Sequence, residues 1–330
     1  IEGVETTLVG PENSLDPDSI TGEGPIAQSA WTTGNKTVLY IRVNYPDDLT
    51  DPQSVSSCES MFTSSNSFFQ ENSYGLTSLT PTITPLLTLP QNKAYYAGSA
   101  GDNLILSDAR TVASAAGYNY STYNLYCVRF QGAGGSYGGM AYVGSTGCWM
   151  KSSSAGVLCH ELGHNYGLWH ANFWNATGDS VIGPGSHVEY GDSFDTMGSA
   201  NAGAYHFNAY EKNRLDWIPT ASVTTITASG TYRVTQFDDA SFSAGTIYGL
   251  KVRKDSDRDY WLDFRQKFTS NRWLMSGVDL HWDPWASSAS GSHLLDTTPG
   301  SPSGKTDSAI VIGRTFSDYS SGIHITPIAK

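Results

Sequence analysis

The chain has 330 residues, of which 39% are hydrophobic and 15% charged, with a formal net charge of −12 and a sequence pI near 4.9. A protein with this negative charge repels nucleic acid and anionic membranes, so neither partner is expected. No apolar run approaches the roughly 18 residues of a membrane span. The chain does not open with a charged n-region followed by an apolar h-region, which predicts a soluble protein that has already been processed. We expect it to be a monomer.

The first half of the chain alternates between strand and helix patterns. Residues 1–35 are rich in Gly, Pro, Ser and acidic residues without periodicity, which predicts an extended arm. The segments that follow are predicted as a strand at 37–45, a helix at 53–72, a strand at 77–88, a helix at 102–116 and a strand at 125–130. This order is typical of an α/β fold with a mixed, mainly parallel sheet.

A short strand is predicted at 138–144, between glycine-rich turns. If its outer side is unpaired, its backbone could hold an extended peptide by strand addition, with Gly139 and Ala141 as binding residues. A plain hairpin or bulge explains the glycines equally well.

The segment from His160 to His170 reads HELGHNYGLWH, inside a helix predicted at 153–167. His160 and His164 are one helical turn apart, so both imidazoles can reach one metal ion. Glu161 stands beside them and is the candidate general base, because a carboxylate can take a proton from water at a catalytic zinc.

His170 could not reach the same ion if the helix continued, because six further residues would place it about 240° around the axis and about 9 Å along it. Gly167 solves this problem, since glycine accepts positive φ and can end the helix. The sequence therefore predicts three zinc ligands, His160, His164 and His170. Chance produces the full pattern in roughly one chain in a hundred thousand.

The eleven residues resemble the signature HExxHxxGxxH of the metzincin zinc peptidases, and Asp195-Thr196-Met197-Gly198 resembles the Met-turn of that family. The resemblance spans roughly residues 36–218. It implies an apolar floor under the ligands at Met197, and Ser199 stands where the astacin branch has a tyrosine ligand, so no fourth protein ligand is expected.

Within the metzincins, the segments 69–75 and 208–217 are similar to those of the gametolysin-like secreted peptidases. The resemblance implies a secreted, extracellular zinc endopeptidase that acts on proteins or peptides. Zinc would polarise the scissile carbonyl, and Glu161 would move the proton of the attacking water to the leaving amine.

Four cysteines, Cys58, Cys127, Cys148 and Cys159, allow three pairings, and their even number predicts two disulfides in an oxidising compartment. Cys159 adjoins His160, but a fourth thiolate ligand would close the position that catalysis needs. A disulfide is therefore preferred there.

The stretch 171–193 is predicted as a loop that walls the pocket, with Phe173, Trp174 and Tyr190 as candidate lining or core residues, and a helix is predicted at 205–215. Pro219 marks a domain boundary. The short alternating runs beyond it predict an antiparallel β-sandwich, and they lie at 222–228, 230–235, 246–253, 260–265, 277–282 and 309–312.

The predicted organisation is an arm at 1–35, a metzincin-like catalytic domain at 36–218 and a β-sandwich accessory domain at 219–330. A structural Ca²⁺ stays open as a second cofactor, although the acidic run at 255–259 lacks the glycine of an EF-hand loop and fits a hairpin turn better.

An alternative function is a secreted adhesin or carbohydrate-binding protein with a vestigial zinc site. Its binding residues would be aromatic side chains of the sandwich, namely Trp261, Trp273, Trp282 and Trp285. Tryptophans in a sandwich are more often core residues than sugar platforms. The remaining histidines, His187, His206, His281, His293 and His324, have no metal-ligand spacing, and His206 follows the Met-turn closely.

Overall fold

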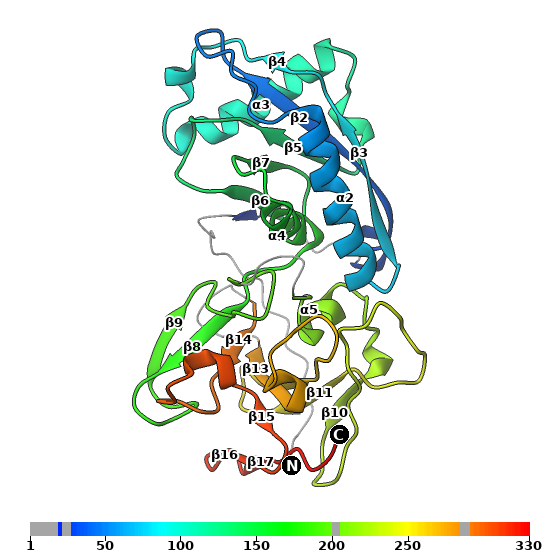
Figure 1. Cartoon of the computed structure of the whole chain (residues 1–330), viewed down its shortest axis with the longest axis vertical. Coiled ribbons are helices and arrows are strands. Elements are labelled where there is room, and N and C mark those ends of the chain that lie inside the picture. Colours follow the sequence, from blue (N-terminus) through cyan, green and yellow to red (C-terminus); the bar gives the residue numbers. More distant parts are fainter. Residues whose placement is uncertain (1–18, 22–27, 200–204, 284–290) are drawn as a thin grey trace. The chain divides into compact units, whose positions relative to one another are not determined.

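The computed structural model describes residues 19–21, 28–199, 205–283 and 291–330, which form two compact units (Figure 1). The N-terminal unit holds the described residues up to Gln70 together with Gly75–Gly167, and the C-terminal unit holds residues 71–74 and the described residues from Leu168 onward. The boundary predicted after residue 218 therefore falls inside the C-terminal unit.

The N-terminal unit is built on a sheet of seven strands in the order β1-β6-β7-β5-β2-β3, with β4 also pairing with β2. Every pair in it is parallel except β6–β7. The strands are β1 (Ser19–Thr21), β2 (Gly34–Asn44), β3 (Thr77–Ile83), β4 (Leu87–Thr88), β5 (Leu125–Arg129), β6 (Gly139–Val143) and β7 (Cys148–Met150).

Helices cover both faces of this sheet, as parallel strands require. They are α1 (Gln28–Thr32), α2 (Val55–Asn72), α3 (Ala100–Ala115) and α4 (Ala155–Tyr166), with 3₁₀ turns at Lys93–Tyr96 and Tyr120–Thr122. On one face Leu39 and Ile41 of β2 share a core with Ile105 of α3. On the other face Tyr40 packs edge-on against Phe62 of α2, with ring centroids 5.2 Å apart. The predicted α/β pattern of this region is confirmed.

Helix α4, which carries the histidine motif, is held against α2 and β3. The Ser65 hydroxyl of α2 donates to the Ala155 carbonyl over 3.4 Å. The ring of Tyr166, at the end of α4, stacks on Phe69 with centroids 5.1 Å apart, and its hydroxyl lies 2.7 Å from that of Thr77 in β3. Both ends of α4 are thereby fixed within the N-terminal unit.

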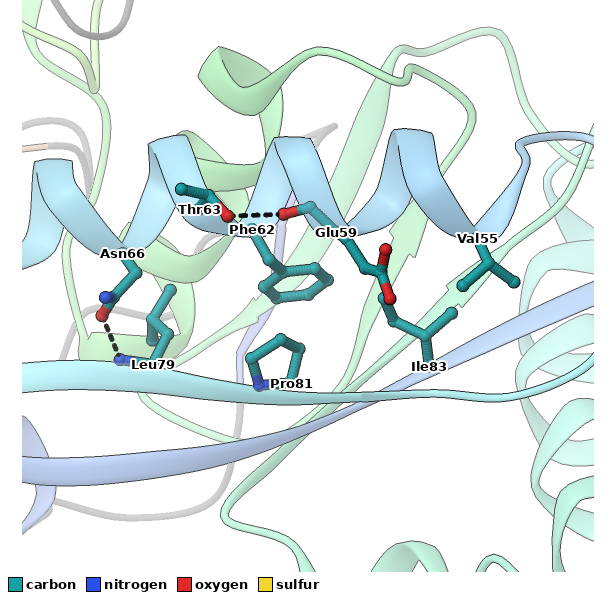
Figure 2. A pocket seen from close by; sticks show the side chains of 8 residues that line it. All are labelled: Val55, Glu59, Phe62, Thr63, Asn66, Leu79, Pro81 and Ile83. Carbon is teal, nitrogen blue, oxygen red and sulfur yellow. Dashed lines mark hydrogen bonds between the residues drawn. The ribbon is translucent and has the colours of Figure 1, made fainter.

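A hollow of about 480 Å³ lies between α2 and β3 (Figure 2). Phe62 of α2 and Pro81 of β3 contribute apolar walls, and Glu59 contributes a carboxylate. The hydrogen bond that Leu79 N donates to the Asn66 side chain, 2.7 Å, links the helix to the strand there. None of the candidate catalytic or ligand residues lines this hollow.

The C-terminal unit contains an eight-stranded sheet in the order β10-β11-β12-β13-β14-β8-β9, in which β15 also pairs with β13, and a two-stranded sheet β16-β17. Its strands are β8 (Asn172–Ala176), β9 (Gly185–Val188), β10 (Val223–Ile226), β11 (Gly249–Arg253), β12 (Asp259–Asp263), β13 (Gly277–Asp283), β14 (His293–Leu295), β15 (Ile310–Val311), β16 (Phe316–Asp318) and β17 (Ile323–Ile325). Its helix is α5 (Ala209–Arg214), with 3₁₀ turns at Thr220–Ser222, Leu274–Ser276 and Gly304–Asp307.

This unit departs from the sequence prediction in three places. The stretch 171–193, predicted as a loop, contains the antiparallel hairpin β8–β9, which joins the large sheet through the parallel pair β8–β14. The pair β10–β11 is also parallel, where an antiparallel sandwich was predicted. The run at 230–235 forms no strand, although Thr235 N donates to the Ile247 carbonyl.

The run at 255–259 is the predicted hairpin turn between β11 and β12, with Lys254 N donating to the Arg258 carbonyl over 3.0 Å. The Asp255 carboxylate pairs with Lys254 and Arg258. These contacts leave the calcium hypothesis without support. Among the described residues, no helix combines the length and the apolar character that crossing a membrane requires.

Candidate metal centre

Helix α4 presents the first two histidines because its start is capped and its turns are regular. The Ser154 side chain accepts a hydrogen bond from Gly156 N over 3.1 Å, which satisfies one of the free N–H groups at the helix start. One turn apart, the rings of His160 and His164 lie edge to face, with centroids 4.8 Å apart. His164 is buried and His160 is partly exposed.

Gly167 ends α4 as the sequence predicts. Its φ of 116° lies in the left-handed region, and its N–H donates to the carbonyls of Gly163 and His164. The chain leaves the helix at this point, and His170 follows three residues later. The conformation is the one that glycine adopts at least cost.

The three predicted ligands come together. One ligand atom from each of His160, His164 and His170 lies within 4.8 Å of the others, and this is the only such group of His, Cys, Asp or Glu among the residues that the structure describes. Zinc–nitrogen bonds of about 2.0–2.1 Å in a tetrahedron separate ligand nitrogens by about 3.4 Å. Three imidazoles gathered within the observed limit of 4.8 Å are the donor set of a catalytic zinc.

His170 is fully buried and is oriented by Glu189, which the sequence analysis missed. The His170 Nδ1 lies 3.1 Å from the Glu189 Oε1, so a proton on Nδ1 leaves Nε2 as the ligand atom. The Tyr190 ring packs on His170 with centroids 3.7 Å apart, and Tyr190 adopts a φ of 56°. Glu189 follows the end of β9 and has no spacing relation to the motif, so only the hairpin reveals it.

We expect Gly167→Ala to weaken zinc binding by about 5- to 30-fold, because left-handed backbone costs a residue with a Cβ about 1–2 kcal/mol. Relief of that strain would redirect the chain before His170. Zinc affinity measured by competition with a chelator tests the prediction.

Gly117→Ala is the matched control, since Gly117 also has a positive φ, 92°, just after α3, and no atom within 4 Å of an added Cβ. It should lower thermal stability and leave zinc affinity unchanged. Equal zinc affinity in the Gly167→Ala and wild-type proteins would contradict the role given to the bend.

Met197 is buried in a tight turn that contacts the residue after His170. Its carbonyl accepts a hydrogen bond of 3.0 Å from the N–H of Ala171, the residue after His170. Gly198 is required in this turn, because a Cβ there would lie 2.2 Å from the carbonyl oxygen of Asp192. The turn is thus tied to the segment that delivers His170.

The carboxylate of Asp195 stabilises the same turn by hydrogen bonds. It accepts hydrogen bonds from Met197 N at 2.8 Å and from Asn208 N at 2.6 Å. Burial and the neighbouring Asp192 raise the pKa of Asp195 to about 6, while burial and Asp195 raise the pKa of Glu211 well above its usual value. Burial and the adjacent carboxylate both favour the neutral form of Glu211.

Gly139 and Ala141 lie in β6 and are both buried. The proposed strand addition required the outer side of β6 to be unpaired, but β1 pairs with it in parallel, with Ser19 opposite Ala141. The three-residue strand β1 comes from the predicted arm, where no periodicity could indicate it. Substrate binding by Gly139 and Ala141 stays a prediction.

All four cysteines are free and buried in the structure, where the sequence predicted two disulfides. Cys127 and Cys148 face each other on β5 and β7. Burial raises the pKa of Cys58 to about 11 and that of Cys159 to about 12, so both stay protonated at neutral pH. A protonated Cys159 agrees with its absence from the ligand group.

The other histidines lie outside that group. His206 is buried, with its ring stacked on Phe268 and its Nδ1 3.0 Å from the Lys212 ammonium. The His281 Nε2 lies 3.0 Å from the Asp192 Oδ2, and the His187 Nδ1 lies 2.7 Å from the His293 Nε2. Each of these histidines has a structural partner.

Comparison with known proteins bears on the segment that carries the motif. Residues 86–203 match the sequence profile of the family Peptidase M66. No curated protein matches the chain. A solved structure titled "Structure of a chaperone-substrate complex" is similar over 47% of this chain and 31% of that one, with 16% identity and a TM-score of 0.32.

The family match covers all three histidines, Glu161 and Met197. It supports a peptidase, and the histidine cluster suggests that its metal is zinc. The adhesin alternative is not favoured. Trp261 and Trp282 are core residues, 5% and 1% exposed, and Trp285 lies outside the described residues.

Proposed function

We propose that this protein is a secreted zinc-dependent endopeptidase of the metzincin type, nearest to the gametolysin-like peptidases. The observation that carries the proposal is the convergence of His160, His164 and His170 beside a buried Glu161, in a segment that matches a peptidase family. Three protein ligands leave a coordination position open, as catalytic zinc requires. When bound, zinc would polarise a scissile carbonyl and lower the pKa of water to about 7.

The residues of the chain divide the remaining work. Glu161 follows His160 on α4 and is 2% exposed, so a carboxylate oxygen is held at the site with little competing solvent. Its role is to accept the proton of the attacking water and to deliver it to the leaving amine. Glu189 holds the His170 ring in the orientation that presents Nε2.

The substrate is a protein or peptide, and we propose that cleavage takes place outside the cell. The low charged fraction of 15% is the support from composition for an extracellular enzyme. We also propose that the protein is a monomer.

Cleavage of a peptide library with and without a zinc chelator tests the proposed function. Hydrolysis should stop on chelation and return when zinc is added back. Hydrolysis that persists in the metal-free protein, or no hydrolysis at one bound zinc per chain, would refute it.

A further inference from the structure

Strand β6 turns two different faces to its surroundings, because successive residues of a strand point to opposite sides. Met140 lies in the buried core that includes Leu106 of α3, and Tyr142 packs against that core. Gly139 and Ala141 belong to the opposite face. That face carries the two smallest side chains of the strand, and Glu161 of α4 lies against it.

The Glu161 side chain occupies the space that a side chain at residue 139 would need. A Cβ added to Gly139 would lie 2.4 Å from the Glu161 Oε1, 2.6 Å from its Cγ and 2.7 Å from its Cδ. No real Cβ tolerates such distances, so the glutamate would have to move. These atoms are the three nearest to the added Cβ, and all of them belong to this one side chain.

Backbone conformation does not explain the glycine. Gly139 is part of a regular strand and is absent from the glycines with positive φ. The neighbouring Gly138, which precedes the strand and is exposed, has open surroundings, since its added Cβ would meet Ser152 and Val157 at 3.9 Å and 4.0 Å, which are ordinary contacts. The requirement for glycine at 139 therefore comes from the carboxylate opposite it.

We propose that Gly139 is a positioning residue for the general base: its missing side chain is the space that holds the Glu161 carboxylate. This inference rests on the proposed function and adds a determinant on a separate element of the fold. Glu161 is 2% exposed, so it has little free volume into which to move. A methyl group at 139 would shift the base within a folded site, and a displacement of about 1 Å can cost about 100-fold in rate.

The first test compares Gly139→Ala with Gly138→Ala in the full chain loaded with zinc. Gly139→Ala should lower kcat by about 100-fold, with KM nearly unchanged and one zinc still bound. Gly138→Ala should keep the kcat of the wild type. A Gly139→Ala protein with wild-type kcat would overturn the inference.

The second test is a stability cycle that needs no activity. Overpacking should lower the melting temperature of Gly139→Ala by about 2–8 °C in the wild-type background and in Glu161→Gln, whose side chain has the same size. In Glu161→Ala, which lacks the Cγ, Cδ and Oε1 atoms, the same change should have no effect. An equal loss in all three backgrounds would overturn the inference.

The two proposals fail in different ways. Failure of the proposed function appears as wild-type protein without chelator-sensitive hydrolysis. Failure of the positioning role appears as an active wild type whose Gly139→Ala variant is equally active. It also appears if Gly139→Ala lowers the melting temperature equally whichever residue stands at 161.

Discussion

Replacing Glu161 with glutamine should leave zinc bound and reduce peptide hydrolysis by about 100- to 10,000-fold, the usual contribution of a general acid–base residue. The amide has the shape of the carboxylate but cannot accept the proton of the attacking water. The buried setting strengthens this expectation, because Glu161 is 2% exposed and bulk water has little access to replace it. The measurement is kcat/KM on a cleaved peptide together with zinc content.

Glu59→Gln provides the matched control for that change. Glu59 is exposed on α2 and lines the hollow beside β3, which contains no candidate catalytic residue. Its amide variant should keep full activity. An active Glu161→Gln protein would refute the role assigned to Glu161. It would not bear on the proposed zinc ligands.

Removing His170, the third proposed ligand, should have a comparably large effect on zinc binding and hydrolysis. We expect His170→Ala to lower zinc affinity by more than about 100-fold and to abolish hydrolysis, since even the loss of a partner that only orients a ligand costs 10- to 100-fold. Two imidazoles on one turn of α4 would remain, without the ligand delivered by the bend at Gly167. Zinc content after dialysis against a weak chelator measures the loss.

His324→Ala is the control for the third ligand, because His324 is exposed on β17 and hydrogen-bonds Ser317. It should retain one zinc per chain. His170 is fully buried, so circular dichroism must first establish that the His170→Ala variant is folded. A folded His170→Ala protein that holds zinc as tightly as the wild type would remove His170 from the ligand set.

Local patterns were enough to predict the cluster of three histidines. The spacing of His160 and His164 depends only on the helical repeat, and the need for a bend before His170 follows from the same geometry. The structure has the helix, the left-handed Gly167 and the converging histidines. The longer strands and helices of the N-terminal unit, such as β2 and α3, were also predictable, because the apolar run of β2 and the periodic pattern of α3 lie within short windows.

Long-range pairing was not predictable in the same way. The parallel pair β8–β14 joins residues about 120 positions apart, so the segment 171–193 read as a loop when taken alone. Strand β1 is three residues long, and its pairing with β6 leaves no periodic signal.

The sequence by itself determined the candidates for metal binding and for the general base, because that chemistry depends on residue type and on spacing within one helix and its end. Only the tertiary structure decided what holds these groups in place: Glu189 beside His170, the turn of Met197 beside Ala171, and the empty space at Gly139 beside Glu161. Each of these contacts joins separate elements of the fold. Their packing depends on the path of the whole chain, which a local pattern does not contain.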